Sequence, residues 1–422
     1  MSRFPLLLCT ILPVSIALQA GSRLSIKPEL KSGLDSLVTR LAAQDSFSGV
    51  VLVARKGAVA YQRAVGLADR ERRVPMTVDT RIQIASTTKL FTQIAIRQLE
   101  QAGRLALSDT VGKYLSDYPN RTVRSKVTIE QLLQHRSGVG SFWNARFAAT
   151  HASVRTIDDY LRLFENDSLL FEPGTNEAYS NGGFVILGAI IEHVSGLSYH
   201  EYVKRHIFEP AGMSQTGPYD SRSIRPRSAV GYTFQSLGGA VIGDPRLAGA
   251  GSRPGYAPPF QGNTSVTQPP PSRARDSAPT GMRLMIIGPD GRQLSPEEAR
   301  AAVADRAAAN TVRRPNTQFE AGVSGPAGDD FSTVGDFLKL ANALTSNKLL
   351  DPTRTAAVLG QRYATGGDFR ANGGGPGVNA EFSIFPSGDV VVVFSNYDPP
   401  AATSIAQFIR SELKSSSQPS AK

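Results

Sequence analysis

A serine and a lysine three residues apart stand at the start of a predicted helix. Ser86 and Lys89 lie in the run Ser-Thr-Thr-Lys, after a short apolar segment (82–85) and before apolar residues at helical spacing. Positions three apart share a helix face, so the two side chains are expected to project together. A serine hydroxyl becomes a nucleophile when a base lies within about 2.6–3.2 Å, and a desolvated lysine can be that base. The pair predicts acyl transfer, with N–H groups of the first helical turn stabilising an oxyanion.

The same pattern recurs at Ser411 and Lys414, where a polar C-terminal tail favours a solvated helix end, so context must decide between them. A second candidate motif is Tyr179-Ser180-Asn181, between a Pro-Gly turn and an apolar helix. The phenol of Tyr179 could relay protons, and the amide of Asn181 could hold a substrate carbonyl. The alternative interpretation is a turn tyrosine that caps a helix.

A third candidate is the glycine run that precedes the C-terminal strands, Asn372-Gly373-Gly374-Gly375. Consecutive glycines allow a backbone to approach a ligand closely, and their N–H groups could complete an oxyanion hole. A flexible loop is the alternative, and composition alone favours it.

The first twenty residues have the pattern of a secretory signal peptide. Arg3 supplies a positive start, residues 5–17 are apolar, and Leu18-Gln19-Ala20 ends on a small residue suited to cleavage. We therefore expect a periplasmic or secreted protein without a stable membrane span after cleavage; an uncleaved anchor or a buried N-terminal helix are the alternatives. The only cysteine, Cys9, lies in this segment, so a mature form would have no disulfide, catalytic thiol or cysteine-bound metal.

The rest of the composition excludes other classes of function. The 422 residues are 41% hydrophobic, enough for a large core and two or three lobes. The net charge of +10 comes without a nucleic-acid motif, which favours solubility and surface adhesion over nucleic-acid recognition. All five histidines lie between His135 and His206, and none belongs to a metal-ligand pattern. We expect no metal and no cofactor.

Apolar periodicity predicts two β-hairpins near opposite ends of the chain, at 49–65 and 382–394. They can share one antiparallel sheet with helices on its faces, and a mostly helical lobe is then inserted between them, in an α/β (α+β) arrangement. The predicted helices cover residues 28–45, 88–102, 128–135, 156–165, 183–195, 199–208, 332–344 and 403–413.

These elements divide the chain into two structural units and an insert. The expected domain covers 28–412, with a sheet subdomain at 28–85 and 370–412 and a helical lobe at 86–232 and 320–369. An insert at 233–319 interrupts the lobe and contains a proline-rich flexible stretch at 248–281. A polar tail at 413–422 follows the domain.

Taken in order, the three motifs resemble those of the serine β-lactamase and penicillin-binding protein superfamily, and most closely its class C β-lactamase-like branch. The likeness covers roughly 45–232 and 320–412 and is carried by Arg81–Thr92, Leu132–Gly138, Phe171–Gly174, Tyr179–Gly183, Ser332–Phe337 and the terminal hairpin. The resemblance implies a β-lactamase/transpeptidase-like fold. It implies Ser86 as nucleophile, Lys89 and Tyr179 as general base and acid, Asn181 as a substrate-orienting residue, and the Ser86 N–H as half of the oxyanion hole.

The third motif departs from that pattern, which usually has Lys-Thr-Gly or His-x-Gly. Ala371 takes the cation's position without a gap, and Asn372 takes it with a one-residue gap, in which case Gly375 would give the second oxyanion N–H. The cation typically binds a substrate carboxylate, and one charge-assisted hydrogen bond is worth about 1.5–3 kcal/mol. Its loss would weaken a carboxylate-bearing substrate by one to two orders of magnitude, at about 1.4 kcal/mol per decade. Arg362 or Arg370 could substitute only if the fold brings them to the site.

The sequence therefore favours an exported serine hydrolase that works through an acyl-enzyme. We expect a carboxylesterase or a D-amino-acid peptidase with at most a weak action on β-lactams, and a small ester, amide or peptide as substrate. Peptidoglycan is a candidate partner. The alternative is a catalytically impaired relative that binds peptidoglycan or a partner protein, because the third-motif Lys or His is absent. A true β-lactamase or carboxypeptidase is the third and weakest hypothesis.

Overall fold

The computed structural model describes residues 25–223, 227–234 and 312–415. The expected signal peptide (1–20) and the proline-rich stretch (248–281) lie outside the described residues, as does most of the expected insert.

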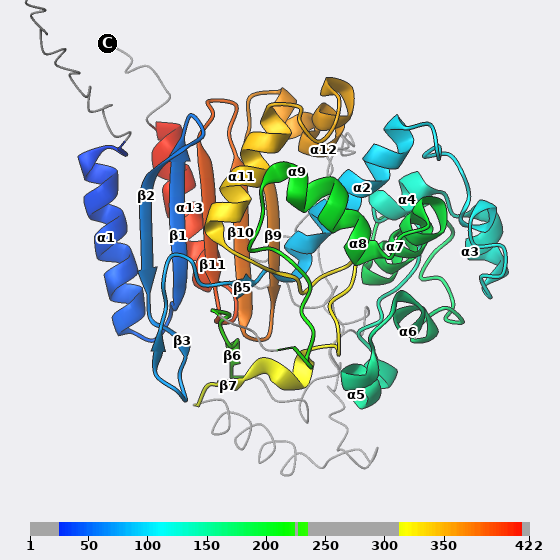
Figure 1. Ribbon diagram of the computed structural model, residues 1–422, viewed down its shortest axis with the longest axis horizontal. Coiled ribbons are helices and arrows are strands. Elements are labelled where there is room, and N and C mark those ends of the chain that lie inside the picture. Colours follow the sequence, from blue (N-terminus) through cyan, green and yellow to red (C-terminus); the bar gives the residue numbers. More distant parts are fainter. Residues whose placement is uncertain (1–24, 224–226, 235–311, 416–422) are drawn as a thin grey trace, which may run out of the picture.

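Strands from both ends of the chain form one antiparallel sheet, as predicted. Its order is β2-β1-β11-β10-β9, so the N-terminal hairpin lies at one edge and the strand with the glycine run at the other. The mixed architecture confirms the predicted fold class (Figure 1). The strands are β1 (Gly49–Arg55), β2 (Ala58–Val65), β9 (Phe369–Gly375), β10 (Val378–Ile384) and β11 (Val390–Ser395).

Local sequence explains the order of this sheet. Lys56 and Gly57 both have positive φ, 48° and 79°, which matches a two-residue turn that follows the twist of β1 and β2. The central strand β11 is buried along its whole length, because its Val-Val-Val-Val-Phe run packs on both faces of the sheet.

Two terminal helices cover one face of the sheet, namely α1 (Pro28–Ala43) and α13 (Ala401–Ser415). A buried ion pair crosses this layer, since Arg410 of α13 donates to Glu381 of β10 at 3.0 Å. Because α13 continues to Ser415, the predicted polar tail begins too early, and the second Ser-x-x-Lys copy lies within this helix. Residues 416–422 lie outside the described residues.

The opposite face packs against the helical lobe (Figure 1). The ring of Phe337 in α11 meets Phe382 and Phe394 of the sheet edge-on, with both centroids 5.0 Å away. The helices of this side are α2 (Lys89–Gln101), α3 (Arg121–Lys126), α4 (Ile129–Leu133), α5 (Ala145–Thr150), α6 (Ile157–Arg162), α7 (Asn181–Ser195), α8 (Tyr199–Val203), α9 (Glu209–Ala211), α11 (Val334–Thr345) and α12 (Pro352–Ala364).

Short strands and turns connect the two parts of the molecule. They include β3 (Leu67–Asp69), β4 (Val74–Pro75), β5 (Ile82–Gln83), β6 (Tyr232–Thr233), β7 (Arg314–Pro315) and β8 (Phe331–Ser332), with the 3₁₀ turns η1 (Ala85–Thr88), η2 (Val111–Lys113), η3 (His151–Ser153) and η6 (Asn316–Phe319) and the π-helical turn η4 (Lys204–Phe208). β6 pairs with β7, so both ends of the expected insert belong to the packed body.

Three helices, α3, α5 and α12, were not predicted, and one prediction about an individual element was wrong. In α12, Asp351 caps the start by accepting from the Arg354 N–H at 2.8 Å, with Pro352 in the first turn. The glycine run belongs to β9 rather than to a flexible loop, because pairing with β10 holds it extended through Gly375.

In the described part of the chain, no single helix is long and apolar enough to cross a membrane. Only the helices Asn181–Ser195 and Tyr199–Ala211 pass together on length and composition, with a bend of 76° between them.

Candidate active site

Ser86 lies in the turn η1, directly ahead of α2. The preceding residue, Ala85, has a φ of 42°, in the left-handed region that costs a non-glycine residue about 1–3 kcal/mol. Two backbone hydrogen bonds hold this strained turn, from Thr87 N–H to the Ile84 carbonyl at 3.0 Å and from Asp329 N–H to the Ala85 carbonyl at 3.2 Å. The nucleophile candidate therefore stands on a sharp, fixed bend.

The structure brings three side chains from distant parts of the sequence to one atom. Lys89 Nζ lies 3.1 Å from Ser86 Oγ, and the Tyr179 hydroxyl donates to the same Oγ at 2.6 Å. The three residues are spread over 93 positions of sequence. An oxygen that contacts both an amine and a phenol has two groups within reach for proton transfer.

Lys89 is fully buried at the base of this group. Burial, opposed in part by the charge of Asp329, lowers the pKa of Lys89 from 10.5 to about 7. Its Nζ also donates to Asn181 Oδ1 at 2.8 Å and to the Ala327 carbonyl. A neutral amine keeps two N–H donors, which these two acceptors can take, and its lone pair then faces Ser86. The arrangement suits a lysine that acts as a base near neutral pH.

Tyr179 and Asn181 are placed by the start of α7. Ser180 caps this helix by accepting from the Gly183 N–H at 2.8 Å, and its own N–H donates to His135 Nδ1 at 3.1 Å. Asn181 Nδ2 donates to Ser141 Oγ at 3.1 Å, which turns Oδ1 toward Lys89. Burial, with the nearby charge of Lys89, lowers the pKa of His135 to about 3, so this imidazole is neutral and serves as an acceptor.

Strand β9 passes directly beside the backbone of Ser86. A Cβ on Gly373 would lie 2.4 Å from the Ile84 carbonyl oxygen and 2.7 Å from Ser86 N, so only glycine fits. Because β9 is the edge strand, its outward N–H groups are not used by β10, and one of them can join the Ser86 N–H in binding an oxyanion. Within the glycine run, Gly373 thus allows β9 to approach the backbone of Ser86 closely.

Asn372 does not face Ser86, contrary to its predicted substrate-binding role. It pairs with Glu381, whose carboxylate contacts Arg410 of α13, so strand alternation puts Asn372 on the α13 face. The position two residues before Gly373 is Ala371, which is fully buried on the Ser86 side of β9. Of the two alternative positions for a third-motif cation, the geometry favours Ala371.

Neither nearby arginine replaces that cation. Arg370 Nε lies 2.6 Å from Asp368 Oδ2, and Arg362 Nη2 lies 2.8 Å from Asp368 Oδ1. Burial acts to raise the pKa of Asp368, but these hydrogen bonds hold that pKa well below its usual value. Both guanidinium groups are tied to this carboxylate at the start of β9.

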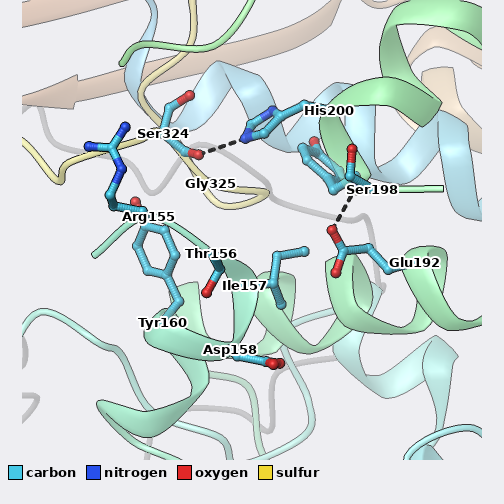
Figure 2. Close-up of a pocket in the computed structure, with 11 residues that line it drawn as sticks. Arg155, Thr156, Ile157, Asp158, Tyr160, Glu192, Ser198, His200, Ser324 and Gly325 are labelled. Atoms are coloured by element: carbon cyan, nitrogen blue, oxygen red, sulfur yellow. Dashed lines mark hydrogen bonds between the residues drawn. The ribbon is translucent and has the colours of Figure 1, made fainter. Parts of the chain in front are cut away.

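A cavity of about 240 Å³ lies between α6, α7 and α8, beside the start of the loop 324–330. Figure 2 shows Ser324 and Gly325 of the loop in its wall, opposite Glu192. None of the predicted site residues lines it. Within the ranges that the structure describes, no group of three His, Cys, Asp or Glu side chains could hold a metal ion.

The beta-lactamase family profile matches residues 34–413. The chain belongs to the beta-lactamase family. A curated relative, penicillin-binding protein 4* of Bacillus subtilis (strain 168), is 33% identical over 215 residues, which cover 50% of this chain and 47% of the relative. The chain therefore matches about half the length of this relative. The family comprises serine hydrolases of the penicillin-binding protein and β-lactamase type.

Solved structures share the fold of this family member. A penicillin-binding protein from Bacillus halodurans superposes with a TM-score of 0.63 at 24% identity, covering 89% of this chain and 99% of its own. D-amino acid amidase from Ochrobactrum anthropi SV3 gives a TM-score of 0.61 at 19% identity, with 92% and 100% covered. At these identities the likeness concerns the fold.

Sequence reasoning missed the loop 324–330 of this family member. Its Ala327 carbonyl accepts from Lys89, and Gly328 passes near the Ser86 backbone, where a Cβ would lie 3.8 Å from Ser86 N. The available signal was two adjacent aspartates, Asp329 and Asp330, directly after a Gly-Pro-Ala-Gly segment. Carboxylates in an apolar, glycine-rich segment often have a specific partner.

Proposed function

We propose that this protein is a serine hydrolase that forms an acyl-enzyme on Ser86 from an ester or amide, in the manner of a carboxylesterase or a D-amino-acid amidase or peptidase. The observation that carries the proposal is the convergence of Lys89 Nζ and the Tyr179 hydroxyl on Ser86 Oγ, at 3.1 and 2.6 Å.

In acylation, Ser86 Oγ attacks the substrate carbonyl carbon while its proton passes to the neutral amine of Lys89. The negative oxygen is bound by the Ser86 N–H and an outward N–H of β9. Tyr179 then gives a proton to the leaving alcohol or amine, and the C–O or C–N bond breaks. The phenolate regains a proton from Lys89. Water attacks the ester on Ser86 by the reverse sequence and releases the acid.

The electrostatics of the site favour neutral substrates. The third-motif position is occupied by the buried methyl group of Ala371, and Arg362 and Arg370 are paired with Asp368. Among the described residues, a carboxylate next to the scissile bond, as in penicillins, would find no cation at this position. An ester or the amide of an amino acid carries no such charge, and the D-amino acid amidase of similar fold is named for such a substrate.

The proposal also includes export of the protein from the cytoplasm. The positive, apolar and small-residue order of residues 1–20 supports action in the periplasm or outside the cell, where peptidoglycan fragments are available as peptide substrates.

The test is a substrate panel with wild type and Ser86→Ala side by side. The panel holds p-nitrophenyl butyrate, D- and L-phenylalanine amide, and nitrocefin. We expect hydrolysis of the ester or an amide by wild type only, with nitrocefin slower by at least an order of magnitude. Equal rates for the two proteins would remove Ser86 from the mechanism, and rapid nitrocefin turnover would contradict the argument from charge.

The buried Ala371 also favours a second candidate, a relative that binds without turnover. This candidate predicts that peptidoglycan fragments bind to wild type and to Ser86→Ala alike, with no hydrolysis of any member of the panel. The intact contacts among Ser86, Lys89 and Tyr179 favour the enzyme.

A further inference from the structure

His135 contacts Tyr179 from the turn that follows α4. The imidazole ring packs against the phenol ring, and the two ring centroids lie 4.7 Å apart. The same imidazole packs against the ring of Phe184 in α7, with the centroids at 5.2 Å. Since His135 is buried, its ring fills the interior beside Tyr179.

Two hydrogen bonds from the segment 178–180 end on this one residue. The Ala178 N–H donates to the His135 carbonyl at 3.0 Å, and the Ser180 N–H donates to His135 Nδ1 at 3.1 Å. These two N–H groups belong to the residues immediately before and after Tyr179. His135 therefore holds the backbone of Tyr179 on both sides and, through its ring, the side chain as well.

The loop that leads to Tyr179 does not fix the phenol by packing of its own. Residues 175–177 are exposed and have no regular secondary structure. The hydrogen bond of 2.6 Å from the Tyr179 hydroxyl to Ser86 Oγ nevertheless requires a defined position of the phenol. That position is set where the chain becomes buried, at the contacts with His135 and at the helix cap formed by Ser180.

His135 is costly to the stability of the fold at this position. Its φ is 58°, in the left-handed region where a non-glycine residue is strained. The other ring nitrogen, Nε2, is buried and has no hydrogen-bond partner among the described residues, which is also unfavourable. A glycine would avoid the first cost, and an apolar ring would avoid the second. The contacts with the segment 178–180 are the described feature that offsets both costs.

The imidazole belongs to the same ring cluster that surrounds the base. Lys89 Nζ lies 4.8 Å from the ring centroid of Tyr179 and 5.5 Å from that of Phe184, the two rings on which His135 packs. Because Nδ1 accepts from the Ser180 N–H, the neutral ring carries its hydrogen on Nε2. A protonated ring would lose this acceptor and with it the bond that follows Tyr179.

We propose that His135 is a positioning residue that holds the Tyr179 hydroxyl on Ser86 Oγ, within reach of the leaving group. This inference rests on the proposed acyl-enzyme chemistry. When the bond between the carbonyl carbon and the leaving group breaks, the Tyr179 proton moves to the leaving oxygen or nitrogen, and the phenolate regains a proton from Lys89. His135 exchanges no proton and acts by fixing where the phenol lies.

The test compares two esters with the same acyl group, p-nitrophenyl butyrate and ethyl butyrate. Nitrophenolate leaves without taking up a proton, whereas ethoxide needs one, so the ratio of the two kcat/KM values reports proton donation to the leaving group. His135→Gly relieves the strained φ and removes the whole ring. We expect kcat/KM for ethyl butyrate to fall about 100-fold, as for a displacement of about 1 Å, and kcat/KM for p-nitrophenyl butyrate to fall less than about tenfold.

A conservative variant should rescue part of this loss. Asparagine tolerates the left-handed conformation, and its Oδ1 can accept from the Ser180 N–H in place of Nδ1, but it has no ring to pack on Tyr179. In His135→Asn the ratio of the two esters should therefore lie between those of wild type and His135→Gly. This variant also keeps the test open if one of the two does not fold.

Two controls separate positioning from a general loss of structure. In a Tyr179→Phe background, His135→Gly should not change the ratio further, because the group that it positions is gone. In the matched control His151→Asn, a ring whose Nδ1 lies 2.6 Å from the Glu320 carbonyl oxygen is removed, and the ratio should stay that of wild type.

Equal losses for the two esters in the folded His135 variants, or a further change in the Tyr179→Phe background, overturn the inference. Wild type that hydrolyses neither ester instead refutes the proposed function.

Discussion

Replacement of Gly373 by alanine tests whether activity depends on the close approach of β9 to the backbone of Ser86. The added Cβ would lie 2.4 Å from the Ile84 carbonyl oxygen, whereas ordinary contacts begin near 3.4 Å, so the strand and the turn η1 must separate by about 1 Å. A displacement of that size costs about 100-fold in rate, and loss of an oxyanion donor costs about 100- to 1000-fold. We expect kcat/KM for p-nitrophenyl butyrate to fall within this range. Overpacking should also destabilise the fold by about 1–3 kcal/mol.

The same strand offers a matched control. A Cβ on Gly375 would meet only Val378 Cγ1, at 3.7 Å, and alanine keeps the backbone N–H. Gly375→Ala should therefore retain the activity and the melting temperature of wild type. If Gly373→Ala is folded and as active as Gly375→Ala, the proposed contact between β9 and Ser86 does not shape the active site.

Three further outcomes follow from the geometry. Since the pKa of Lys89 is lowered to about 7 and the neutral amine is the base, the rate of Ser86 labelling should fall about tenfold per pH unit below pH 7; a flat profile between pH 5 and 8 would contradict this. Tyr179→Phe removes the 2.6 Å hydrogen bond to Ser86 and should lower kcat by about 100- to 10,000-fold in the substrate panel, with an unchanged melting curve. Arg410→Ala leaves the buried Glu381 carboxylate unpaired and should lower the unfolding free energy by about 3–5 kcal/mol in urea titrations, while Arg410→Met with Glu381→Gln restores most of it; equal losses in both would show that packing, not charge, dominates.

Much of the fold could be predicted because its elements carry strong local patterns. In the two hairpins, apolar residues alternate with polar ones or form continuous runs between turns, and helices α2 and α7 have long apolar faces. The positions of these elements were therefore predicted to within a few residues. The strand character of Asn372–Gly375 could not be predicted in this way. Its glycines have no β-propensity, and the extended conformation comes from pairing with β10, which is a tertiary effect.

The same difference between local patterns and tertiary effects applies to the residues of the site. Ser86 and Lys89 are neighbours in sequence, so local helical geometry predicted their contact, and the family likeness added Tyr179 and Asn181. Strand register decides that Asn372 faces α13, and one residue of register moves a side chain to the other face. The Ala327 carbonyl accepts from Lys89 across 238 positions of sequence, and no local pattern links the two residues.

Mass spectrometry of the protein after fluorophosphonate treatment tests the central claim most directly, since it asks which atom is the nucleophile. We predict one adduct per chain, located on the peptide that contains Ser86 and absent from Ser86→Ala. Unmodified wild type at pH 8, or an adduct on another serine such as Ser411, would contradict the account.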